Sequence, residues 1–337
     1  MNSIQQASHF KSDVSFANNA PASSCKECSN LTELLGPNYY AHVAEQSAKY
    51  GGAHKEQDDF LMLPVVDFVF KLLFGDAKRT ERLQSLLSSI LQLPNEEFQD
   101  LTIMNPNLPP DFAGDKYGIL DVRAAMTDGR QINIEIQVLP YAAMPERTLY
   151  YWGKMYTQQL AEGESFADLK KCIAINIMDY NFPLAKSVHS VYHIVEDGNQ
   201  SRLTDVLEIH FLDLEKLRRG LDIEGLNPSM LKWLRFLAAK RKEEFEMLAK
   251  EDKELDRAYE RLQQISADDE ARIWYEVRQK GILDQRTIEV VARKEGKAEG
   301  LKEGKTEVAL SALKEGMDIA LIAKLTGLSE EEIKKLA

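Results

Sequence analysis

The chain has 337 residues with 44% hydrophobic and 8% aromatic content, which suits a soluble globular protein of about two domains. No apolar run reaches the length of a membrane span, and the polar start lacks a signal-peptide pattern. Three cysteines cannot build a disulfide framework. We therefore expect a cytoplasmic protein and exclude the membrane-spanning and disulfide-rich secreted classes.

The distribution of charge argues against strong attraction to nucleic acid. The net charge is −12, and between residues 59 and 214 there are 13 Lys and Arg against 22 Asp and Glu, so this segment alone carries −9. Nucleic-acid-binding proteins usually show a basic footprint. Binding to DNA is therefore expected to be weakly sequence-specific, or to depend on another element of the chain.

Residues 1–58 are rich in Ser, Asn, Ala and Gln and show no sustained periodicity, which predicts a disordered N-terminal extension. Cys25 and Cys28 lie within it at the spacing of half a zinc site. No second cysteine pair follows, so an accident of spacing is the preferred interpretation.

Apolar residues recur at helical spacing over residues 64–92, with a break at Gly75 and Asp76, and predict two helices. Asp67 and Lys71 are four residues apart on the first helix and should be neighbours on one face. From the residues alone, an intrahelical ion pair is the preferred interpretation.

The most informative segment is a predicted hairpin over residues 120–138 with its turn at Asp128-Gly129. Strand side chains alternate, so the isoleucines of the second strand should face a core while Glu135 and Gln137 share the opposite face. The folded-back ribbon brings Asp121 beside them. The alternative, which spacing alone favours, is an edge hairpin with an acidic solvent face.

Two carboxylates and a carbonyl would suit Mg²⁺, which prefers oxygen ligands and keeps several waters. We expect Asp121, Glu135 and the Ile136 carbonyl to be the ligands, with Mn²⁺ as a substitute. An ion held there could polarise a phosphoryl oxygen and lower the pKa of a bound water for attack on a phosphodiester.

A helix is predicted after the hairpin, with Pro145 in its first turn. Arg147, Tyr151 and Lys154 then fall on one stripe, which could contact the phosphate backbone of DNA. The alternative is an ordinary polar helix face, with these apolar side chains turned inward: Leu149, Trp152 and Met155.

Residues 171–178 predict a central strand that is buried on both faces, which gives an α-β-β-α-β order and a central mixed sheet flanked by helices. Residues 188–195 and 206–214 predict a second hairpin. It carries His189, His193 and His210, which could bind a metal, although polar surface histidines are the preferred interpretation.

The C-terminal third predicts a helical extension over residues 221–293, a glycine-, lysine- and glutamate-rich helical tether over 294–307 and a small helical module over 308–337. Gly296, Gly300 and Gly304 weaken a helix, so the tether is expected to fray. The module resembles the first half of a helix-turn-helix, but its second helix begins with three glutamates, which suit a major groove poorly. We interpret it as a packing module that could join copies into a homo-oligomer.

The hairpin and its surroundings resemble the PD-(D/E)XK nuclease superfamily, although Gln137 stands where the motif has lysine. This departure is similar to the Rpn branch of recombination-promoting nucleases and transposases, as are residues 67–75, 118–122 and 147–156. The resemblance covers roughly residues 60–217 well and the C-terminal tail more loosely.

The resemblance implies a restriction-endonuclease-like α/β core over residues 59–220 and a Mg²⁺-dependent DNA endonuclease that acts in recombination. It implies that Asp121 and Glu135 bind the metal and that Gln137 orients the attacking water. Lys71 would replace the missing ammonium, and Asp67 would lie near the ion through water. The missing motif lysine and the acidic core favour the alternative, a catalytically inactive interaction module. Nothing in the sequence indicates strand transfer by a transposase in the strict sense.

Overall fold

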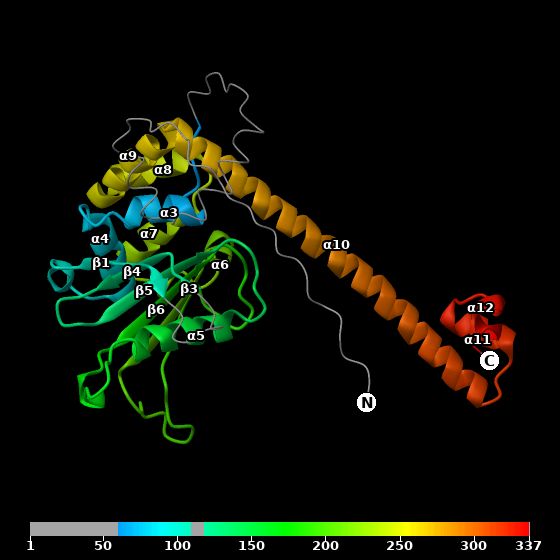
Figure 1. The fold of residues 1–337 in the computed structure, drawn as a ribbon. Coiled ribbons are helices and arrows are strands. Elements are labelled where there is room, and N and C mark those ends of the chain that lie inside the picture. Colours follow the sequence, from blue (N-terminus) through cyan, green and yellow to red (C-terminus); the bar gives the residue numbers. More distant parts are fainter. Residues whose placement is uncertain (1–59, 109–117, 337) are drawn as a thin grey trace, which may run out of the picture.

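The computed structural model describes residues 60–108 and 118–336, and Figure 1 shows a mixed sheet with helices on both faces and a long helix leading to a small C-terminal unit. The predicted disordered extension, with Cys25 and Cys28, lies outside the described residues. Within the described ranges, no helix combines the length and the apolar character needed to cross a membrane.

The two N-terminal helices are α3 (Asp67–Phe74) and α4 (Glu81–Leu91), as predicted. Gly75 ends α3 and donates its N–H to the Lys71 carbonyl. The apolar faces of both helices are buried in the main core. A 3₁₀ turn, η1 (Asn95–Phe98), leads from α4 into the sheet.

The main sheet has six strands in the order β1-β4-β5-β6-β8-β7. The strands β1, β4 and β5 are antiparallel to one another, β5, β6 and β8 are parallel, and β7 is antiparallel to β8. The bounds are β1 (Thr102–Met104), β4 (Val122–Ala125), β5 (Gln131–Gln137), β6 (Cys172–Met178), β7 (His189–Tyr192) and β8 (Leu207–Asp213). Both predicted hairpins and the buried strand are present. The sequence did not predict the short strands β1, β2 (Asn107–Leu108) and β3 (Gly118–Ile119).

Side chains of β5 point alternately to the two faces of the sheet, which differ in environment. Ile132, Ile134 and Ile136 enter the main core with α3 and α4, while Glu135 and Gln137 point to the opposite side of the sheet. Helix α5 (Met144–Thr157) crosses from β5 to β6 on that side, where Met144 packs in a second apolar cluster. Glu135 therefore lies between the sheet and α5, toward the carboxyl end of β5.

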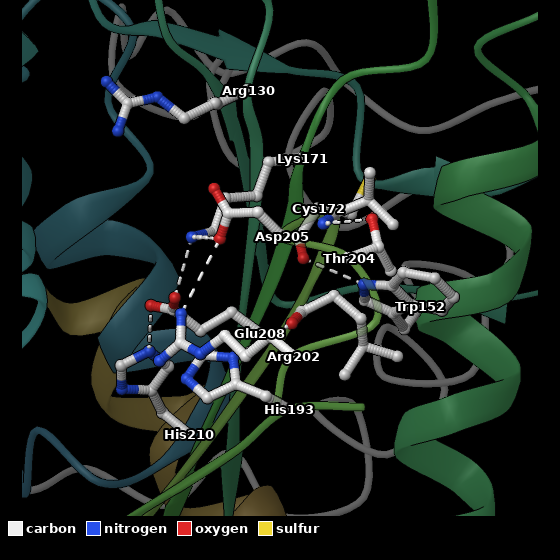
Figure 2. A network of polar contacts seen from close by, with 12 residues as sticks. Arg130, Trp152, Lys171, Cys172, His193, Arg202, Thr204, Asp205, Glu208 and His210 are labelled. Atoms are coloured by element: carbon white, nitrogen blue, oxygen red, sulfur yellow. Dashed lines mark hydrogen bonds and ion pairs between the residues drawn. The ribbon is translucent and has the colours of Figure 1, made fainter. Parts of the chain in front are cut away.

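The second hairpin corrects the expectation of surface histidines. His210 is 3% exposed and stacks on His189, with 2.8 Å between His189 Nε2 and His210 Nδ1. His193 instead contacts the Leu207 carbonyl. Figure 2 shows the network that continues from His210 to Glu208 and Lys171, whose contacts measure 2.8 Å each.

Helices from the C-terminal third complete the main core. Side chains of α7, α8 and α9 share one apolar cluster with α3 and α4. The bounds of this group are α6 (Leu214–Arg218), α7 (Pro228–Ala238), α8 (Lys242–Glu251) and α9 (Lys253–Ala267). The nuclease-like sheet and the helical extension are thus joined by continuous packing.

Helix α10 (Asp269–Lys314) is 46 residues long and runs unbroken through Gly296, Gly300 and Gly304, where fraying was expected. Flanking Ala, Glu, Lys and Leu are strong helix formers and offset the glycines. Helices α11 (Ile319–Thr326) and α12 (Glu330–Lys334) fold back on the end of α10 around a small core of Ala309, Ile322 and Ile333.

Candidate metal centre

The hairpin brings Asp121 and Glu135 together. Asp121 lies in the bend before β4, and the pairing of Val122 with Ile134 places it beside the end of β5. Its Oδ2 accepts a hydrogen bond from the Ile136 N–H at 2.9 Å, and its own N–H donates to Glu135 Oε1 at 3.3 Å. The two carboxylates and the Ile136 peptide therefore share one small volume.

Helix α3 adds a cation to this volume. Lys71 Nζ lies 3.3 Å from Asp121 Oδ1, and both side chains are nearly buried. Asp67, one turn earlier, pairs with Arg278 of α10 through two contacts of 2.9 and 2.8 Å. The predicted intrahelical pair is thus replaced by two ion pairs that connect α3 to the hairpin and to α10.

Helix α5 adds a second cation. Arg147 Nη2 lies 3.3 Å from Glu135 Oε2, and its guanidinium lies over the Tyr151 ring at 5.6 Å from the centroid. Arg147, which was expected to contact phosphate, therefore belongs to the candidate site itself.

Lys154 of the predicted basic stripe does not reach the surface. Lys154 is only 6% exposed, with its ammonium over the Tyr150 ring. Met155 is buried, but Leu149 is 49% exposed, so the alternative interpretation is wrong for Leu149. The helix is rotated so that Thr148 faces the sheet, where its hydroxyl hydrogen-bonds to Asn176 of β6.

Gln137 ends β5 and is half-buried. Its side-chain amide has no hydrogen bond to another residue within 60–108 or 118–336, while its backbone carbonyl accepts from the Asp179 N–H at 2.8 Å. An amide with free donors and an acceptor can bind water or substrate.

Burial and mutual repulsion disfavour negative charge on both acids. Burial raises the pKa of Asp121; Lys71 opposes this shift and Asp67 adds to it. Burial and the neighbouring Asp121 raise the pKa of Glu135 to about 8, although Arg147 opposes the shift. A divalent cation would stabilise both carboxylates, so this donor set fits Mg²⁺.

The donor set is small. No group of three or more His, Cys, Asp or Glu suited to a metal occurs in the part of the chain that the structure describes. An ion between Asp121 and Glu135 would therefore need neutral oxygens and water to complete its coordination, as Mg²⁺ commonly does.

Two further arginines reach the site from α10 and were not predicted. Arg278 holds Asp67, and Arg286 Nη2 lies 3.4 Å from the carbonyl of Val138, the residue after Gln137. These contacts join residues 211 and 148 positions apart. No local motif or periodicity indicates contacts at such separations.

A mixed sheet flanked by helices, with two acids on a central hairpin, defines an α/β fold of the nuclease class. The family model described as PD-(D/E)XK nuclease family transposase matches residues 64–290, and the chain belongs to this family. The model described as Rpn/YhgA-like nuclease family, C-terminal HTH domain, matches residues 302–337. No curated protein and no solved structure matches the chain.

These matches confirm the predicted family and fold class. They also bear on the C-terminal module, for which packing was preferred over DNA binding. The match to a helix-turn-helix domain favours DNA binding there instead.

Proposed function

We propose that this protein is a Mg²⁺-dependent DNA endonuclease that hydrolyses phosphodiester bonds during recombination. The observation that carries the proposal is the buried pair of Asp121 and Glu135, joined through the Asp121 N–H and each accompanied by a cation. Membership of a nuclease-transposase family supports it.

In this proposal Asp121, Glu135 and the Ile136 carbonyl hold Mg²⁺, for which Mn²⁺ can substitute. When bound, the ion would supply Lewis-acid activation of a phosphoryl oxygen and of a water molecule. The Gln137 amide, which is free to bind water, orients the attacking molecule. Asp67 contacts the site through water and is kept in place by Arg278.

Lys71 and Arg147 together supply the positive charge that Gln137 cannot. Each lies 3.3 Å from one of the two carboxylates and offsets its charge. With those carboxylates engaged by a cation, both side chains can turn their charge to the phosphate, where charge develops during hydrolysis. The role of the motif lysine is therefore divided between α3 and α5.

The helix-turn-helix unit would bring DNA to an acidic core. Residues 302–337 contain six lysines and seven acidic residues, and the lysines can bind phosphates without reading sequence. Helix α12 begins with three glutamates, one of which forms a capping box with Ser329, so base readout through it is disfavoured. We therefore propose weakly sequence-specific binding to DNA.

A second candidate is an inactive interaction module that retains the fold. It is favoured by Gln137 in the motif position and by the ion pairs that already engage both acids.

Plasmid nicking and calorimetry separate the two candidates. We expect supercoiled plasmid to be nicked with Mg²⁺ or Mn²⁺, to stay intact with EDTA, and to be nicked at least about a hundredfold more slowly by Asp121→Ala. Mn²⁺ binding measured by isothermal titration calorimetry should be lost in the same variant. The matched control is Asp205→Ala, because that carboxylate is 74% exposed near the start of β8. Equal nicking by the Asp121 variant would remove the hairpin from the mechanism.

A further inference from the structure

Helix α10 passes the candidate metal centre and touches the core on two elements of the site. Arg278 binds Asp67 at the start of α3, and eight residues later Arg286 reaches the end of β5 at Val138. Eight helical residues span about 12 Å. The first half of α10 therefore contacts both α3 and the end of β5 beside the candidate metal centre.

Arg286 differs from the other cations near the site. Lys71, Arg147 and Arg278 each face a carboxylate. Arg286 is exposed, and its one hydrogen bond within the described residues is the 3.4 Å contact to the Val138 carbonyl. A guanidinium has five N–H donors in a rigid fork, so most of its donors and its full charge remain available.

Arg286 contacts the chain directly after the last residue of β5. Val138 directly follows Gln137, whose side-chain amide is proposed to orient the attacking water. The Arg286 guanidinium therefore contacts the backbone next to that residue. The surrounding core is acidic and offers little other attraction for a polyanion. A guanidinium fork binds phosphate oxygens in a bidentate manner, which fixes orientation as well as affinity.

We propose that Arg286 binds a backbone phosphate of the DNA strand beside the scissile bond. This inference rests on the proposed function and assigns to α10 a substrate contact in the same site. Arg278 fixes the helix through Asp67, and Arg286 uses that fixed position to place the strand over Asp121 and Glu135.

Kinetics of plasmid nicking test the proposal. Arg286→Ala should raise KM about tenfold and leave kcat within about twofold, because a lost phosphate contact weakens binding of substrate and transition state alike. The KM of Arg286→Lys should lie between those of the wild type and Arg286→Ala, because an ammonium keeps the charge but not the bidentate geometry of the guanidinium. The control is Arg293→Ala, two turns further along the same exposed face of α10, which should match the wild type.

A binding experiment keeps the test independent of catalysis. Binding of a fluorescein-labelled DNA duplex is followed by anisotropy in Ca²⁺ over a series of salt concentrations. Arg286→Ala should reduce the slope of log Kd against log salt by about 1, and Arg293→Ala should not. Equal slopes for the wild type and Arg286→Ala would overturn this inference, as would an equal loss in both variants. Absence of nicking by the wild type would overturn the proposed function alone.

Discussion

In the candidate metal centre, each of two acids faces a cation that comes from a helix outside the hairpin. Lys71 of α3 faces Asp121, and Arg147 of α5 faces Glu135. The sequence predicted the meeting of the acids because a β-ribbon has a fixed period. It predicted a phosphate contact for Arg147 and did not indicate its ion pair with Glu135, because a helical stripe defines neighbours along the helix but not the element that the stripe faces.

Replacement of Arg147 should separate metal binding from catalysis. We expect Arg147→Ala to slow plasmid nicking about 10²- to 10³-fold, as for loss of one stabilising donor, and to retain Mn²⁺ binding by calorimetry. Arg147→Lys should recover part of the rate. Arg130→Ala, which removes a partly exposed arginine paired with Glu97 and Asp128, serves as the control. Loss of both metal and rate in Arg147→Ala would indicate a structural role.

The histidine pair on β7 and β8 predicts acid sensitivity. Burial and repulsion from His210 lower the pKa of His189 to about 4, although Glu208 opposes this. The folded pKa lies below the unfolded value of about 6.5, so the unfolded state binds the proton more readily. The contribution of His189 to the free energy of unfolding should therefore fall as pH drops from about 6.5 to about 4.

Urea unfolding in EDTA across that range checks this prediction. His189→Gln removes the titrating ring and should show a weaker pH dependence than the wild type. The pKa of Glu208 is lowered to about 2 by hydrogen bonds and by cations, despite its burial. Its contribution to the free energy of unfolding is lost only below about pH 4.5, which is outside most of this window. Identical pH profiles for the two proteins would contradict the assignment to His189.

At the scale of single elements, local chemistry predicted strands better than it predicted the long helix. The Asp128-Gly129 turn forms as expected, with Gly129 at a φ of 88° that favours glycine. The glycines of α10 were expected to make the helix fray, yet it continues because its flanking residues favour helix throughout. The cost of one glycine, about 1 kcal/mol, is decisive only where the rest of the helix is marginal.

Glycine replacements test this balance with opposite signs. A Cβ at Gly300 would meet no atom within 4 Å, so Gly300→Ala should strengthen α10 and slow amide exchange around it about fivefold. Gly129→Ala has positive φ and a contact of 3.0 Å to Lys170, so it should lower the melting temperature. Hydrogen exchange and thermal melts measure the two effects. Faster exchange in Gly300→Ala would show that the glycine has a packing role.

At the scale of the whole molecule, contacts between distant segments determine the features that the sequence did not predict. Helices α7 to α9 pack into the same core as α3 and α4, and Arg278 and Arg286 return to the site from far along the chain. Hydrophobic periodicity shows which face of a helix is buried but not which distant segment covers it. The family resemblance supplied the order of the core, and the packing of the extension required coordinates.

Removal of the helix-turn-helix unit should affect DNA binding without unfolding the core. The small cluster of Ala309, Ile322 and Ile333 is separate from the main core, so a chain ending at residue 301 should keep the melting temperature of the main transition. Its KM for plasmid should rise and its salt dependence should weaken, with kcat little changed. Unaltered KM in the truncated protein would show that this unit does not deliver DNA.

The unbroken helix α10 sets the distance between the candidate metal centre and the C-terminal unit. From Arg286 to Lys314 the helix advances by about 42 Å, which equals about 12 base pairs of duplex. Under the proposed function, cuts should therefore fall at a set offset from the point where the terminal unit binds DNA. Lengthening α10 by two turns should move the cleavage sites about three base pairs farther from that point.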